Sequence, residues 1–116
     1  MRALDQAGVV VAGGADNVQD PFNSMGRVDP FETASLLVMA GHLLPDEAWT
    51  WVTDRARQIM GLEPIRVAPG HVADLLAVRA GSLREALASA PADRVVLKGG
   101  RVVSRTRVEQ EFPTLG

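Results

Sequence analysis

The chain of 116 residues has no cysteine and no tyrosine, only two histidines, and no long apolar run. The lack of cysteine excludes disulfides and thiolate metal sites, and it suits the cytoplasm, where we expect the protein to act. No segment approaches the roughly 20 apolar residues that cross a bilayer, and the amino terminus has no apolar core of a signal peptide. We therefore expect no membrane partner.

Strongly basic segments are also missing, since the net charge is −2 and both signs are scattered along the sequence. A nucleic-acid surface usually shows as a basic stripe with interleaved aromatics, so we expect no nucleic-acid partner. What is present is a 47% share of hydrophobic residues, which is typical of a folded chain and excludes disorder as the default.

Several catalytic patterns are absent as well. His42 and His71 form no H-x-H or H-x-x-x-H pair, and no Ser-His-Asp or Cys-His arrangement can be assembled. We expect His42 at a helix end, where a cation is favourable, and His71 in a turn, so that neither binds a metal. The glycine patterns of dinucleotide and phosphate loops do not occur either.

The first half of the chain shows four expected elements. Residues 2–7 indicate the last turn of a helix that Gly8 ends, and the apolar residues 9–12 indicate a strand buried on both faces of a parallel sheet. Asp29 predicts the start of a helix that runs to Gly41, with Glu32 closing a capping-box-like pair. The last is a helix over residues 45–60.

The tryptophans of that last helix lie two positions apart and so point to different sides. We expect Trp49 in the core and Trp51 partly exposed.

The second half indicates a small β unit. Residues 73–78 predict a strand that Asp74 opens, and Ser82 with Glu85 predicts the capping box of a short helix. Two further strands flank Gly99-Gly100, which is a hairpin signal, and residues 106–116 read as a polar tail.

The chemistry-bearing candidates follow the first expected strand. Asp16 stands at its carboxyl end after small residues, where barrel enzymes keep their catalytic groups. It could bind a divalent metal and accept a proton, or it could be a turn aspartate bonded to its own loop. Asn17 could meet a substrate edge or form an Asx-turn. Asp20-Pro21 predicts a turn with Phe22 packed beneath it.

These residues also carry a family resemblance. The pattern GADNV, DPF, G and DP over residues 14–30 resembles the strand-eight segment of the amidohydrolase superfamily, in its cytosine deaminase-like branch. The later pattern PGHVADLL over residues 69–76, with residues 94–103, is similar to the closing strands of that superfamily.

The resemblance implies roles for three residues. The matching aspartate of the family, here Asp16, ligates the metal and moves protons between the metal-bound hydroxide and the leaving amine. Asn17 and Phe22 match positions that line the pyrimidine pocket. Because the family commonly carries an acid and a larger aromatic there, the substrate could equally be cytosine or a related cyclic amine or amide. Zinc or iron is the implied divalent metal.

The resemblance also implies a fold class and domains. We expect an α/β chain that forms the carboxyl-terminal fragment of a (β/α)8 TIM barrel, with the last barrel strand and its following helices, plus strands of a small β-sandwich. The expected division is barrel in 1–63, composite β-sandwich in 64–105 and polar tail in 106–116.

Such a fragment lacks the histidine ligands and catalytic glutamate of the family, so we expect it to bind no metal and to be inactive alone. The alternative is a non-catalytic folded module that associates with a partner or with the rest of a split enzyme. The chain could also form an oligomer.

Overall fold

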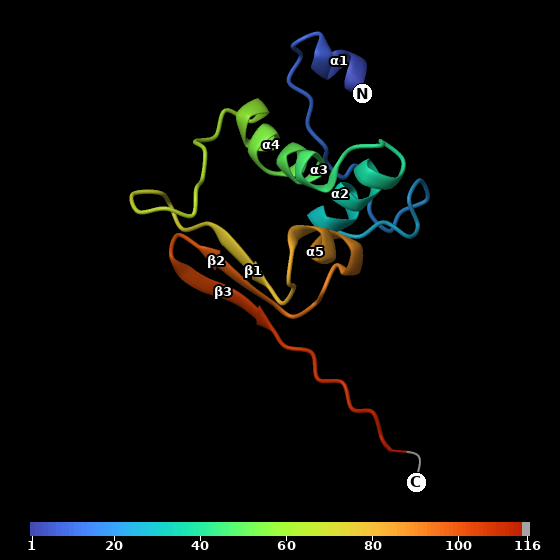
Figure 1. The fold of residues 1–116 in the computed structure, drawn as a ribbon, viewed down its shortest axis with the longest axis vertical. Coiled ribbons are helices and arrows are strands. Elements are labelled where there is room, and N and C mark those ends of the chain that lie inside the picture. Colours follow the sequence, from blue (N-terminus) through green and yellow to red (C-terminus); the bar gives the residue numbers. More distant parts are fainter. Residues whose placement is uncertain (115–116) are drawn as a thin grey trace.

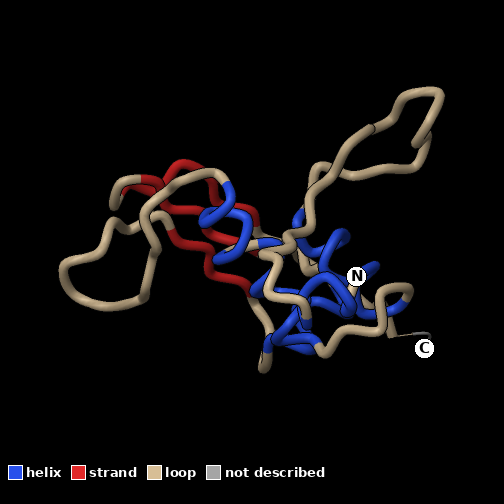
Figure 2. Tube along the Cα trace, turned by 90° about the horizontal axis from the view of Figure 1, so that it is seen from above, coloured by secondary structure: helices blue, strands red, loops and turns tan. Residues whose placement is uncertain are grey.

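The computed structural model describes residues 1–114 and shows a mixed α/β chain, with helices on one side and a small antiparallel sheet on the other (Figures 1 and 2). The helices of the described part are α1 (Arg2–Gln6), α2 (Pro30–Met39), α3 (Pro45–Val52), α4 (Asp54–Ile59) and α5 (Leu83–Ser89). The strands are β1 (Leu75–Val78), β2 (Arg94–Lys98) and β3 (Arg101–Thr106). No helix in residues 1–114 has the length and hydropathy that crossing a membrane requires.

The core lies where α2, α3 and α5 meet. Apolar side chains at helical spacing bury one face of each helix, and removal of this apolar surface from water is what holds them together. Its buried members are Phe31, Ala34, Leu43, Ala48, Trp51, Ala86 and Leu87. The core therefore draws residues from both sides of the division expected after residue 63, and that division stays a prediction.

Two helix starts were predicted correctly. The Asp29 carboxylate accepts a hydrogen bond from the Phe31 N–H at 3.0 Å, and the Ser82 hydroxyl accepts one from the Glu85 N–H at 3.1 Å. The capping-box-like pair at α2 differs from expectation, because Glu32 accepts from the Arg27 N–H at 3.2 Å.

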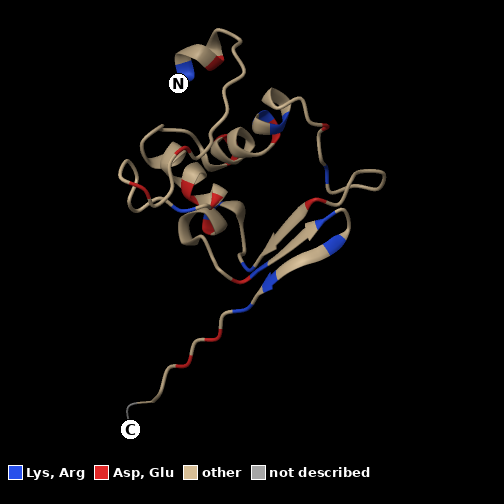
Figure 3. Cartoon of the chain, turned by 180° about the vertical axis from the view of Figure 1, so that it is seen from behind, with Lys and Arg blue, Asp and Glu red and all other residues tan. Residues whose placement is uncertain are grey.

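The sheet has the order β1-β2-β3, with both pairs antiparallel and a bulge between Val96 and Leu97. Gly99 and Gly100 turn the β2–β3 hairpin with φ of 55° and 77°, which glycine adopts without strain. Asp74 joins β1 to this turn, since its carboxylate accepts from the Gly99 N–H at 2.8 Å and from the Lys98 ammonium. Charges of both signs are interspersed over the helices, whereas the charged residues of the three strands are all Lys or Arg (Figure 3).

The prediction of a buried strand over residues 9–12 is wrong for this structure. The segment has no strand partner within residues 1–114, and Val9 and Val10 are 49% and 41% exposed. A strand needs a neighbour to satisfy its backbone groups. The segment is anchored at its end, where the Gly13 N–H donates to the Trp51 carbonyl at 3.1 Å.

That hydrogen bond also explains why residues 45–60 form two helices rather than the predicted single one. In an uninterrupted helix the Trp51 carbonyl would accept from residue 55. Here it accepts from Gly13, and the chain breaks at Thr53, with φ −119° and ψ −88°.

The expected roles of the tryptophans are reversed. Trp51 is 2% exposed and lies under the Arg55 guanidinium, 5.1 Å from its ring centroid. Trp49 is half-buried and stacks on Phe31, with 5.1 Å between the ring centroids.

Candidate functional site

The candidate site is a loop, here called the site loop, that covers residues 16–29 between the extended segment and α2. Gly13 fixes its entry, because a Cβ there would lie 2.7 Å from Leu37 Cδ1 and 3.2 Å from Val52 Cγ1. Only glycine lets the backbone lie this close to α2 and α3. The next residues therefore leave the helical layer at a defined place.

Asp16 is the first residue of the site loop and is exposed. Its carboxylate makes no hydrogen bond within residues 1–114, so it is not the loop-bonded turn aspartate that was the alternative. A carboxylate of this kind is free to take a proton or a cation. Its predicted catalytic and metal-binding role stays a prediction.

Asp20 takes the turn role instead. Its Oδ1 accepts from the N–H groups of Phe22 and Asn23, each at 2.9 Å, as the Asp20-Pro21 pair predicts. Gln19 precedes it with φ 52°, a left-handed conformation that is uncommon for glutamine. The expectation that Phe22 packs beneath the turn is wrong, since Phe22 is 87% exposed.

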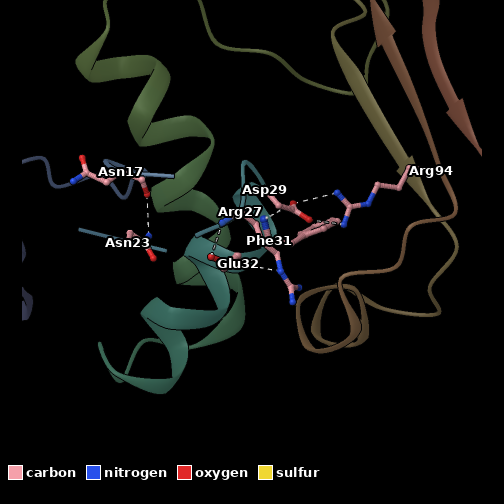
Figure 4. Close-up of polar contacts among 7 residues, drawn as sticks. All are labelled: Asn17, Asn23, Arg27, Asp29, Phe31, Glu32 and Arg94. Atoms are coloured by element: carbon pink, nitrogen blue, oxygen red, sulfur yellow. Dashed lines mark hydrogen bonds and ion pairs between the residues drawn. The ribbon is translucent and has the colours of Figure 1, made fainter. Parts of the chain in front are cut away.

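Asn17 is half-buried, and its backbone carbonyl accepts from Asn23 Nδ2 at 2.9 Å (Figure 4). The Asx-turn that was one alternative for Asn17 is not among the hydrogen bonds of the described chain, so its carboxamide is available to a ligand. Sequence reasoning did not single out Asn23, which no motif marks.

At its far end the site loop is tied to the sheet. The Arg94 guanidinium donates to both oxygens of Asp29, at 3.1 and 2.8 Å, and lies 4.6 Å from the centroid of the Phe31 ring (Figure 4). Arg94 also donates to the Pro91 carbonyl. A two-pronged bond between half-buried groups is geometrically specific. Sequence reasoning missed this contact because the two partners lie far apart in the chain.

Opposing effects act on the pKa of Asp29. Burial of the carboxyl raises it, whereas the hydrogen bonds from Arg94 and Phe31 and the charges of Arg94 and Arg27 lower it. The stabilising contacts outweigh the burial, so the pKa lies below its usual value and Asp29 is ionised at neutral pH.

A hollow of about 180 Å³ lies behind the site loop. It is lined by Gly13, Gly14, Ala15, Val28, Asp29, Pro30, Thr33 and Val52. Asp16, Asn17 and Phe22 are not among these residues, so the chain does not by itself gather its three predicted site residues around this hollow.

The chain's own side chains do not fit a catalytic metal. Residues 1–114 contain no group of three or more His, Cys, Asp or Glu side chains that could hold a metal ion. A catalytic metal usually needs about three protein ligands, and Asp16 can supply one. His42 lies between α2 and α3, and His71 is exposed beside the turn at Gly70.

No family model matches the chain. It is 38% identical over 109 residues to a pterin deaminase from Rhizobium rhizogenes (strain K84 / ATCC BAA-868), a match that covers 91% of this chain and 25% of that protein. The chain therefore spans about a quarter of the length of the curated relative.

Two solved structures share the fold. N-isopropylammelide isopropylaminohydrolase from Burkholderia multivorans ATCC 17616 matches with a TM-score of 0.79 and 34% identity, over 90% of this chain and 28% of that one. The 5-methylcytosine deaminase from Klebsiella pneumoniae, bound to phosphonocytosine, matches with a TM-score of 0.76 and 24% identity, over 97% and 28%.

These matches define a class, namely a segment of a hydrolytic deaminase fold. More specifically, the chain is similar to part of the deaminases of the amidohydrolase superfamily, and the resemblance predicted from residues 14–30 is confirmed.

Proposed function

We propose that this chain supplies the aspartate-bearing loop of a metal-dependent hydrolase that acts on carbon–nitrogen bonds other than peptide bonds and deaminates a cyclic amidine. The observation that carries the proposal is the 38% identity to a pterin deaminase over 109 residues, a match that takes in nearly the whole chain. The free carboxylate of Asp16, in a loop with an anchored entry, supports it.

Asp16 has a defined task in such a reaction. Water replaces the amino group on a ring carbon and ammonia leaves, so a proton must pass from the water to the departing amine. A carboxylate without hydrogen-bond partners can accept that proton and return it. A divalent metal such as zinc or iron would need its other ligands from outside the described residues.

Asn17 and Phe22 are the proposed substrate-binding residues. A carboxamide both donates and accepts, so Asn17 can pair with a ring edge that presents an N–H beside a carbonyl. Phe22 offers an exposed aromatic face for a flat ring. The ring can be cytosine-like or, as in the Rhizobium relative, a pterin. The cytoplasmic location and the absence of nucleic-acid and membrane partners stay predictions.

A complementation assay tests the proposal. The purified chain is incubated alone and with the part of the Rhizobium pterin deaminase that the match does not cover, and ammonia release from pterin and from cytosine is followed. We expect no release from either piece alone and release from the mixture. Turnover by the chain alone would contradict the proposal, as would an inactive mixture in which the two pieces form a stable complex.

A further inference from the structure

Asn23 forms a bracket across the site loop. Its Nδ2 donates to the Asn17 carbonyl at 2.9 Å (Figure 4), and its backbone N–H donates to Asp20 Oδ1, also at 2.9 Å. One residue thus ties the start of the site loop to its turn. The bond fixes the Asn17–Val18 peptide plane, because a hydrogen-bonded carbonyl can no longer rotate freely.

Gly26 packs closely against the Asn23 side chain and the Asn17 carbonyl. It is buried although most of its neighbours in the loop are exposed, and its N–H donates to the Asn23 carbonyl at 3.3 Å. A Cβ on Gly26 would lie 2.7 Å from Asn23 Cγ and 2.9 Å from the Asn17 carbonyl oxygen. Its φ is outside the left-handed region, so an alanine could adopt the backbone. The need for glycine at this position is therefore one of space.

We propose that Asn23 and Gly26 are positioning residues that set the orientation of Asn17 in the deaminase site. Figure 4 shows the Asn17 carboxamide on the side of the residue away from the carbonyl that Asn23 holds. The hydrogen bond from Asn23 holds the backbone at Asn17, and with it the Cα–Cβ bond from which the carboxamide projects. The inference rests on the proposed function for the role of Asn17, and it adds the residues that order the loop before a substrate binds.

The ordering of the site loop is measured by amide hydrogen exchange on the whole 116-residue chain, a measurement that needs no activity assay. Asn23→Asp keeps the shape and the Asp20 contact but places an oxygen against the Asn17 carbonyl. We expect the amides of Phe22 and Gly26 to exchange with solvent about tenfold faster, while α2 and α5 keep their protection. Ser24→Ala, in the same exposed turn, should change nothing. Unchanged exchange in Asn23→Asp would overturn the proposal.

Gly26→Ala gives an independent second variant. It should accelerate the same amides, because the new methyl displaces the Asn23 carboxamide. Combined with Asn23→Ala it should add little, since the carboxamide is already gone. Full additivity of the two substitutions would contradict the claim that Asn23 and Gly26 act through the same hydrogen bonds.

The effect of Asn23 on substrate binding is tested in the complementation mixture of the chain and the Rhizobium piece. Because Asn23 acts through the binding residue Asn17, Asn23→Asp should raise KM about fivefold with kcat nearly unchanged. A merely structural defect would instead reduce the active fraction and leave KM alone, and that result would overturn the positioning role. A mixture that is inactive with the unmodified chain counts against the proposed function, whereas the exchange measurement still decides whether Asn23 and Gly26 order the loop.

Discussion

At the scale of single residues, Asp29 carries two tasks. It caps α2 through the Phe31 N–H and binds Arg94 with both carboxylate oxygens, so one side chain joins the site loop, a helix start and the sheet. Both partners of the ion pair are 20% exposed, which places the pair between a surface contact and a fully buried one.

Replacing Arg94 by methionine should therefore lower the free energy of unfolding by about 2 kcal/mol, because a charged, half-buried hydrogen-bond partner is lost. Urea denaturation of the purified chain measures this. Arg79→Met is the matched control: Arg79 also pairs with an aspartate, Asp93, but its side chain is 81% exposed, so its loss should change stability little. Equal losses in the two variants would contradict the account.

The same pair predicts an acid-dependent stability. The pKa of Asp29 in the folded chain lies below its usual value, so the unfolded chain binds the proton more tightly. The contribution is complete above the unfolded pKa of about 4 and is lost as the pH falls through the lower folded value. Arg94→Met should flatten this acid limb of a plot of unfolding free energy against pH. Identical acid limbs in the two proteins would be the contrary result.

At the scale of elements, local sequence signals predicted the helix starts and the turns, whereas contacts between distant residues determined the helix break and the strand missing from residues 9–12. The caps at Asp29 and Ser82 and the turn at Gly99-Gly100 are set by neighbours within a few residues, so the sequence identifies them. A loop after residue 15 was also predicted, because GADN and DPF lie together in the chain, whereas the roles of its residues stay predictions.

What escaped prediction involves distant partners. At the break at Thr53 the Trp51 carbonyl accepts from the distant Gly13 N–H, a contact that no local pattern shows. The contact of Arg94 with Asp29 spans 65 residues. Residues 9–12 were mistaken for a strand because an apolar run shows the tendency of a segment to be buried but not the presence of a neighbour.

The two glycines at the end of that segment give an element-scale prediction. Gly13→Ala should destabilise the chain by about 1–3 kcal/mol, because its Cβ would meet Leu37 and Val52 between α2 and α3. Gly14→Ala is the matched control, since nothing lies within 4 Å of a Cβ there. Thermal melts of both variants test the claim, and a Gly14→Ala loss as large as that of Gly13→Ala would refute the packing argument.

At the scale of the whole molecule, the described chain is more open than a typical domain of its length. Its radius of gyration is 16.5 Å, whereas about 13 Å is usual near 100 residues. The core has seven buried hydrophobic residues within the described range, and large apolar side chains such as Phe22, Met25 and Val67 are more than 80% exposed. So small a core is typical of marginal stability.

A marginally stable chain offers a test between its two proposed roles, a part of a deaminase and an independent folded module. If the chain completes a deaminase, the uncovered part of the Rhizobium relative should raise its melting temperature, because a partner that binds only the folded form stabilises it. Differential scanning calorimetry with and without that piece gives the answer. A sharp melt from a monomer that the piece does not shift would favour the independent folded module instead.

The most direct test of the central claim compares two aspartates in the complementation assay. We expect Asp16→Asn to abolish ammonia release while the mixture still assembles, because the carboxylate that moves the proton is gone. Asp46→Asn, which removes an exposed carboxylate at the start of α3, should leave release unchanged. Undiminished release by the Asp16→Asn chain would contradict the account.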